Sequence, residues 1–191
     1  VLWAGLLTTA AAVPVLWLVG RRLHGARAAW LAAAFFATNP VVWYHAVSGE
    51  SYAAEALFGT LVILLGLRVD REARRRDLAV FFAVYGLAGA FRQNLPVFFL
   101  PYAAWRLREA CRGRATREVA ARVGVAAGAG LAGVLAWAVP LLSWAGGLGA
   151  AAHLFGSEFF DTFGRQYSYL FGADSAGVLA NLDLLARCTV P

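Results

Sequence analysis

Three charged side chains fall inside or beside strongly apolar segments of the chain, namely Glu50, Glu55 and Arg92. Glu50 lies where a helix is expected to begin, and because a helix dipole favours a carboxylate there, a purely structural role is the alternative. Glu55 lies about one turn further along, so hydrocarbon would surround it unless it faced a polar cavity or a partner. Both acids are therefore candidates for chemistry. His45 and Tyr52 flank Glu50, and we take both as candidate ligand contacts, with an ordinary place in the membrane interface as the alternative.

Arg92 begins a second informative stretch, Arg92-Gln93-Asn94-Leu95-Pro96. If Asn94 caps a helix whose first turn holds Leu95 and Pro96, free backbone N–H groups and the positive end of the helix dipole lie beside a guanidinium. This arrangement predicts an anion site contacted by Arg92, Gln93 and Asn94, for the phosphate of a lipid headgroup or of a lipid-linked molecule. Alternatively, Arg92 extends to the phosphates of ordinary phospholipids.

The composition indicates that lipid is the main solvent of the folded chain. Hydrophobic residues make up 61% of the 191 residues and charged residues only 15%, which is too little polar surface for a water-soluble globule of this size. We therefore predict an all-α fold over residues 1–191, a single polytopic bundle of transmembrane helices with about six passes of about 20 residues each. Because the chain contains no Met, we expect a fragment that is incomplete at both ends.

The arginines predict an orientation in the membrane. Most of them fall in three clusters without interleaved aromatic residues, which argues against a groove for nucleic acid. By the positive-inside rule the loops at 69–77 and 106–118 are cytoplasmic. The segment 145–187 then lies on the non-cytoplasmic side, and its aromatic residues predict interfacial helices, with a plain connecting loop as the alternative. The clusters are Arg21, Arg22 and Arg27; Arg68, Arg71, Arg74, Arg75 and Arg76; and Arg106, Arg108, Arg112, Arg114 and Arg117.

The apolar stretch from Leu78 to Trp105 lies between two of these clusters, so it must cross the membrane and return. Two helices of about 14 residues, joined near Phe91 to Asn94, meet this requirement, although each is shorter than the roughly 17 to 25 residues of a full span. Burial among neighbouring helices or local thinning of the bilayer accommodates such short helices. The sequence therefore predicts a hairpin whose apex carries Arg92.

Other motifs are few. Gly124, Gly128, Ala132 and Ala136 recur every four residues along the last apolar helix, which predicts a face for close packing against a neighbour. The chain has no nucleotide-binding glycine loop, no HExxH and no GxSxG. Neither of its two cysteines falls in a metal-binding spacing. The sequence specifies no cofactor, and dependence on a divalent metal stays open.

At these residues the chain resembles the GT-C superfamily of membrane glycosyltransferases, specifically the bacterial relatives of protein O-mannosyltransferases and aminoarabinose transferases. Gly20 to Ala29 (GRRLHGARAA) is similar to the family's inner loop, and Asn39 to Glu55 is similar to its outer turn, which carries an acidic residue. Gly86 to Gln93 (GLAGAFRQ) resembles its hairpin, whose basic residue is thought to meet the donor phosphate. Ala145 to Asn181 resembles the interfacial loop that follows.

The resemblance implies a transferase of the bacterial cell envelope. Such an enzyme takes a sugar from a polyprenyl-phosphate donor and passes it to a glycan, lipid or protein acceptor on the periplasmic or extracellular side of the plasma membrane. A carboxylate activates the acceptor hydroxyl as general base while a basic residue steadies the departing phosphate. Arg92 matches the phosphate residue, Glu50 best matches the second outer acid, and Glu55 is its rival. The family's main catalytic Asp belongs to an outer loop upstream of Leu2, so we expect the fragment alone to be inactive.

Two other classes of protein stay open. Intramembrane acids and arginines also mark transport paths, so a segment of a transporter or lipid flippase is one alternative. A transporter would have related inverted halves, and the sequence shows no internal repeat. A structural membrane subunit without catalysis is the other alternative. Neither the sugar, the acceptor nor the oligomeric state follows from these residues.

Overall fold

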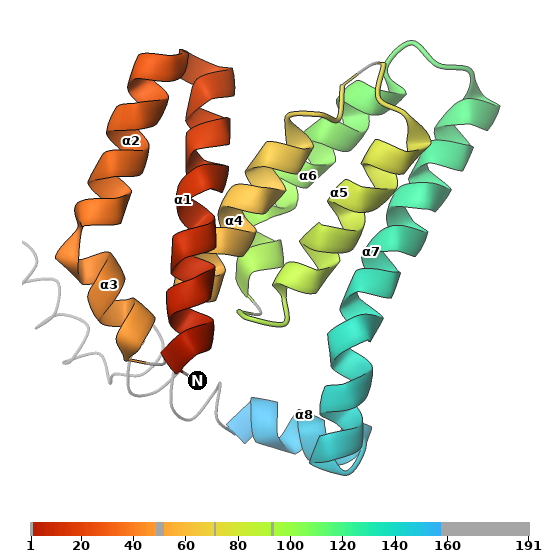
Figure 1. Ribbon diagram of the computed structural model, residues 1–191. Coiled ribbons are helices and arrows are strands. Elements are labelled where there is room, and N and C mark those ends of the chain that lie inside the picture. The colour runs from red at the N-terminus through yellow and green to blue at the C-terminus, as the bar shows by residue number, and fades with distance from the viewer. Residues whose placement is uncertain (1, 49–51, 71, 93, 158–191) are drawn as a thin grey trace, which may run out of the picture. The chain divides into compact units, whose positions relative to one another are not determined.

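A computed structural model describes residues 2–48, 52–70, 72–92 and 94–157, and these residues form α-helices and no strand (Figure 1). The prediction of an all-α fold is thus confirmed. Contacts divide the chain into two compact units, Val1–Ala138 and Val139–Pro191. The helices are α1 (Leu2–His24), α2 (Ala26–Thr38), α3 (Pro40–Val47), α4 (Tyr52–Gly66), α5 (Arg75–Ala88), α6 (Asn94–Cys111), α7 (Thr116–Ala145) and α8 (Leu148–Ser157).

Among the described residues, two helices are long and apolar enough to cross a membrane, over Trp3–His24 and Thr116–Ala145. Only 17% and 11% of their most apolar stretches are buried within the protein, whereas the core helix of a soluble protein is mostly buried. Large apolar side chains of other helices are also exposed, among them Leu31 and Phe35 on α2 and Phe98 on α6, which are 73%, 73% and 74% exposed. Apolar faces of this kind belong to a membrane-associated protein, since water would not cover them at tolerable cost. The number of passes stays a prediction.

The chain between α2 and α3 breaks at Pro40. Proline has no N–H to continue a helix, and the Asn39 side chain accepts the next free N–H, that of Val41, at 2.9 Å. The carbonyl of Ala37 thereby loses its usual partner, and the indole N–H of Trp43 donates to it instead at 2.5 Å. The break therefore leaves these backbone groups satisfied, which an apolar environment requires.

The predicted hairpin is also present, as α5 and α6. The hydroxyl of Tyr85 on α5 donates to the carbonyl of Pro96 on α6 at 2.6 Å, and that of Tyr102 on α6 donates to the carbonyl of Ile63 on α4 at 3.0 Å. Phe81, on α5, is fully buried in the apolar core that α4, α5 and α6 form together. The hairpin is consequently packed against α4 along its length rather than left as two isolated short helices.

Glycines bring α5 and α7 close together within the unit Val1–Ala138, but they differ from those predicted. A Cβ added to Gly86 would collide with the carbonyl of Gly130, and one added to Gly133 would collide with the carbonyl of Ala83. The indole N–H of Trp137 also donates to the carbonyl of Gly86 at 3.1 Å.

The predicted packing face, made of Gly124, Gly128, Ala132 and Ala136, is exposed, and a Cβ at either of its glycines would meet nothing within 4 Å. That prediction is wrong for the described residues. A four-residue spacing indicates a face of small residues on the helix, but it does not identify another helix that packs against this face.

In the second unit, Gly146 and Gly147 end α7. Both have positive φ, 86° and 109°, which glycine adopts without strain. The N–H of Gly147 donates to the carbonyl of Leu142 at 2.9 Å, as in a helix end closed by a left-handed residue. α8 follows, at the start of the segment 145–187, and the remainder of this predicted interfacial segment lies outside the described residues.

A pair of substitutions in α7 tests the glycine contact. Gly133→Ala should destabilise the fold by about 1–3 kcal/mol, because the added methyl group forces α5 and α7 apart. Gly128→Ala is the matched control: its methyl group meets open space, and the higher helix propensity of Ala favours the helix by up to about 1 kcal/mol. Thermal unfolding in one detergent, followed by circular dichroism, compares the two. Equal melting temperatures would contradict the contact.

Candidate functional site

Most of the described candidate residues lie where the hairpin apex meets α3 and the start of α4. The break at Pro40 turns the chain into α3, which carries His45 near its end. Ser48 ends α3, because its N–H donates to the carbonyl of Tyr44 at 3.0 Å and its hydroxyl donates to the carbonyl of His45 at 3.2 Å. Ser48 thus closes α3. α4 then begins at Tyr52 and carries Glu55 in its first turn.

Arg92, between α5 and α6, forms an ion pair with Glu55. Its Nη1 donates to Glu55 Oε2 at 2.5 Å, and the two side chains are 35% and 26% exposed. One residue earlier, the ring of Phe91 stacks on that of Phe58 with centroids 4.3 Å apart. Glu55 and Phe58 are three residues apart on α4 and so share one face of that helix. The apex is therefore attached to α4 by one polar and one apolar contact.

The aromatic ring of Tyr52 fixes the other side of the guanidinium. The Arg92 Cζ atom lies 4.5 Å from the centroid of that ring, within the range of a cation–π contact. The Tyr52 hydroxyl lies 3.5 Å from Arg92 Nη2, at the limit of hydrogen bonding. The ring of His45 packs on Tyr52 in turn, with centroids 4.7 Å apart. His45, Tyr52, Arg92 and Glu55 thus form a continuous row of contacts.

The charge of Arg92 does not depend on pH in any ordinary range. The hydrogen bond to Glu55 raises the pKa of the Arg92 guanidinium above its already high usual value. Only one of its nitrogen atoms is used in that short bond, and a guanidinium has five N–H donors. The group is thus oriented by two neighbours while it keeps donors for an anion.

Of the other predicted site residues, Asn94 is described by the structure, and Glu50 and Gln93 are not. Asn94 is the first residue of α6 and is exposed. The N–H of Leu95 donates to the carbonyl of Arg92 at 3.0 Å, so this N–H is not free for an anion as the sequence predicted. Glu50 and Gln93 lie outside the described residues. The structure therefore brings together His45, Tyr52, Glu55 and Arg92, which the sequence had proposed from two separate motifs.

A small cavity of about 140 Å³ lies beside Tyr52 and His45, with Asn39 and Thr9 among its lining residues. Thr9 is 1% exposed, and its hydroxyl has no hydrogen-bond partner among the described residues. The neighbouring Thr8 instead donates to the carbonyl of Ala4 in its own helix at 2.8 Å. Thr9 could not be recognised from the sequence, because a threonine in an apolar helix usually satisfies its hydroxyl as Thr8 does.

The fold and the site define a class of protein: a membrane-associated helical protein with an oriented, half-buried guanidinium suited to binding an anion. Among the described residues no three His, Cys, Asp or Glu side chains gather as metal ligands would. The row of site residues, from His45 on α3 to Arg92 before α6, spans residues 45–92. A relative with the same site is therefore expected to match this segment.

A family model described as the protein O-mannosyl-transferase TMEM260 N-terminal domain matches residues 6–109. The match covers more than half of the chain and every described site residue, and the chain belongs to this family. No curated protein and no solved structure matches it. The resemblance to protein O-mannosyltransferases is thereby confirmed at the level of the family.

A double-mutant cycle measures the ion pair. Glu55→Ala and Arg92→Ala, singly and together, should give a coupling energy of about 0.5–1 kcal/mol, because the pair is only partly removed from solvent. Tyr52→Phe is the control: it keeps the ring beneath Arg92 and removes only a marginal hydrogen bond, so it should change stability by less than about 0.5 kcal/mol. Chemical denaturation in mixed micelles gives the free energies. Additive effects of the two alanines would show that the pair does not form.

Proposed function

We propose that the chain is part of an integral-membrane glycosyltransferase that moves a sugar from a polyprenyl-phosphate donor to an acceptor on the non-cytoplasmic face of the cell membrane. Membership of a family described as protein O-mannosyl-transferase supports the reaction class. The single observation that carries the proposal is the placement of Arg92, a charged group held by Glu55 and Tyr52 with donors to spare. Mannose is the first donor sugar to test, given that description.

The proposed chemistry follows from the charge that develops as the sugar leaves its phosphate. A fixed guanidinium stabilises that charge without having to reorganise, and its planar donors match phosphate oxygens in pairs. Tyr52 holds the guanidinium plane from one face and Glu55 from one edge, so Arg92 contacts the phosphate and Glu55 acts as a positioning residue. The general base is then Glu50 or the Asp that the family resemblance places upstream.

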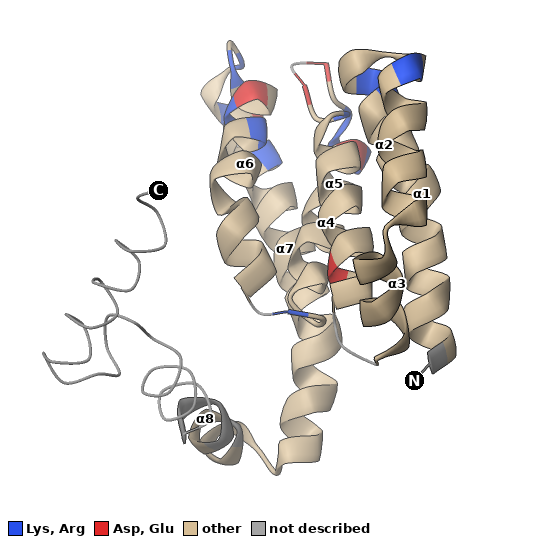
Figure 2. Cartoon of the chain, turned by 90° about the vertical axis from the view of Figure 1, so that its left-hand side faces the viewer, with Lys and Arg blue, Asp and Glu red and all other residues tan. Residues whose placement is uncertain are grey.

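The proposed topology has six passes, with the arginine-rich loops cytoplasmic. Within Val1–Ala138 the described arginines gather at one end of the helices, and the apex that carries Arg92 lies at the other (Figure 2). This separation supports assigning Arg92 and Glu55 to the non-cytoplasmic side by the positive-inside rule. Donor, acceptor and site would then share one side of the membrane.

Cysteine labelling tests the topology in a background in which Cys111 and Cys188 are replaced by Ala. Glu72→Cys and Ala90→Cys are a matched pair, since both positions are exposed and lie at opposite ends of α5. An impermeant maleimide added to intact cells should label position 90 and not position 72. Labelling of position 72 alone would reverse the orientation. Ala73 is unsuitable for this purpose because it is only 5% exposed.

The catalytic proposal is tested in the complete reading frame, with polyprenyl-phosphate-linked mannose and a peptide acceptor. Arg92→Ala should lower kcat/KM roughly tenfold to a hundredfold, because a charge-assisted contact to a partly desolvated phosphate is worth about 1.5–3 kcal/mol. Arg92→Lys should recover only part of this loss, since Lys keeps the charge without the planar pair of donors. Glu55→Gln should lower kcat/KM less than Arg92→Ala, and Glu50→Gln should lower kcat if Glu50 is the base.

Arg27→Ala is the control, because it removes an exposed arginine at the other end of the helices. It should leave transfer within about twofold of the parent, as surface substitutions away from a site usually do. If Arg92→Ala, at equal expression, transfers sugar as fast as Arg27→Ala, Arg92 does not bind the donor phosphate. A role in holding the hairpin would then be all that remains for it.

A further inference from the structure

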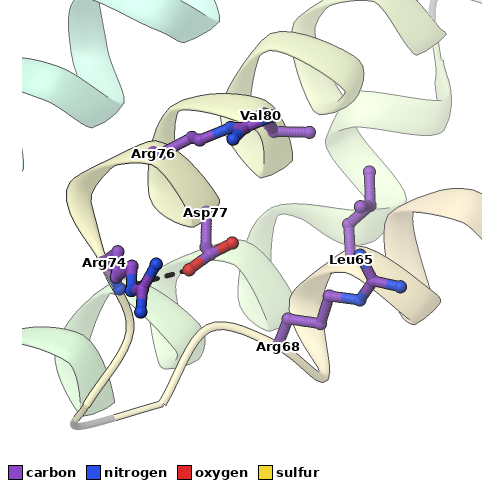
Figure 3. Close-up of a pocket in the computed structure, with 6 residues that line it drawn as sticks. All are labelled: Leu65, Arg68, Arg74, Arg76, Asp77 and Val80. Carbon is purple, nitrogen blue, oxygen red and sulfur yellow. Dashed lines mark hydrogen bonds between the residues drawn. The ribbon is translucent and has the colours of Figure 1, made fainter.

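A polar cavity lies at the arginine-rich end, where α4 ends and α5 begins. Its volume is about 460 Å³, more than three times that of the cavity beside Tyr52. Figure 3 shows its walls: the end of α4 supplies one side, and the first turns of α5 supply the other. Its lining residues are Leu65, Arg68, Arg74, Arg76, Asp77 and Val80.

The loop between α4 and α5 is anchored in the apolar core, and this fixes the backbone positions of Arg68 and Arg74. Val69 and Ala73 are 0% and 5% exposed and belong to the apolar core of α4, α5 and α6. The N–H of Arg68 donates to the carbonyl of Leu65, and the carboxylate of Asp70 accepts from the N–H of Glu72, both at 2.9 Å. Arg68 and Arg74 each adjoin one of the two buried anchors.

The guanidinium groups of the three arginines that line the cavity have no polar partner in the part of the chain that the structure describes. Arg68, Arg74 and Arg76 are exposed, and among the described residues their side chains form no hydrogen bond or ion pair. The adjacent Arg75, which does not line the cavity, pairs instead with Glu118 at 2.6 Å.

Asp77 is the one acidic side chain among the described lining residues, and it already has a structural role. Asp77 accepts the N–H of Arg74 at 3.2 Å at the start of α5, as Figure 3 shows. With three positive groups to one negative group, the cavity is left with an uncompensated positive charge. The N-terminal end of the α5 dipole adds to it.

We propose that this cavity binds the phosphate group of an anionic ligand. Three arginines around one space supply paired donors for several oxygens of a tetrahedral anion, which one snorkelling arginine does not do. The apolar side chains of Leu65 and Val80 in the same walls also suit a phosphate that carries an organic substituent. Either an anionic phospholipid headgroup or a soluble phosphate ester has this chemistry, and the site is independent of the proposed transfer reaction.

The chain offers a matched control for the general attraction between arginines and lipid. Arg21, Arg22 and Arg27 form another exposed group of three at the junction of α1 and α2, and none of them lines this cavity. The variant R68Q/R74Q/R76Q and the control R21Q/R22Q/R27Q therefore remove the same charge from the same end of the helices. A third variant, R68K/R74K/R76K, keeps the charge of the cavity and changes only its geometry.

Native mass spectrometry of the full chain in neutral detergent, titrated with phosphatidylglycerol, measures binding of the lipid. Inorganic phosphate and pyrophosphate are added as competitors of the lipid, to test whether the cavity prefers a soluble phosphate. R68Q/R74Q/R76Q should weaken binding at least about tenfold, which equals about 1.4 kcal/mol, while the control stays within about twofold. The lysine variant should bind between the parent and the glutamine variant. Displacement of the lipid by inorganic phosphate or pyrophosphate would assign the site to a soluble phosphate, and no displacement would assign it to the headgroup.

Three outcomes would overturn the proposal. One is equal weakening in the cavity and control variants, which would mean that only total charge matters. Another is parental affinity of the lysine variant, which would mean that arginine geometry plays no part. The third is no measurable binding of any of these anions by the parent. Helical content and melting temperature are measured for every variant, and if the glutamine triple does not fold, R68Q alone replaces it, with R27Q alone as its control.

Discussion

The ion pair between Arg92 and Glu55 holds the hairpin apex against α4, and the geometry of the candidate site depends on it. α5 and α6 have 14 and 18 residues, and a full membrane span has about 20. Helix length alone therefore does not determine how deep in the membrane the turn between them lies. The pair, together with the stack of Phe91 on Phe58, attaches that turn to the first two turns of α4. Because both side chains are only partly buried, the pair contributes more to the orientation of Arg92 than to stability. The interaction that holds the hairpin therefore also orients the guanidinium.

Local features of the fold could be predicted from the sequence, and contacts between distant segments could not. Pro40 has no N–H and follows Asn39, whose side chain can cap a new helix, so a break there is a local expectation, although Pro14, Pro101 and Pro140 lie inside helices. The arginines on both sides of Leu78 to Trp105 required a turn within that stretch. Among the described residues, nothing packs on the predicted face of α7, because spacing identifies a row of small residues without identifying its neighbour. The close contact between α5 and α7 is made instead at Gly86 and Gly133, which lie on different helices and so form no spacing pattern in the sequence.

The candidate site shows the same division. The sequence indicated that Glu55 needed a partner or a polar cavity, and that Arg92 lay on the same side of the membrane. Nothing in either motif said that each was the partner of the other, because 37 residues separate them. The ion pair with Arg92 changes the role expected of Glu55, which the sequence had offered as a candidate catalytic carboxylate. A carboxylate already bound to a guanidinium is better suited to positioning that group than to removing a proton from an acceptor.

The loop at 67–74 is constrained in its length more than in its composition. Val69 and Ala73 reach the core from the two halves of the loop, and Arg68 and Arg74 stand just outside these anchors. Glu72, between the anchors, is exposed, and its side chain can change in evolution at little cost. One inserted or deleted residue would instead shift an anchor out of the core or move an arginine away from the cavity. Across homologues, the separation of the two arginines should thus vary less than the identity of the residues between them.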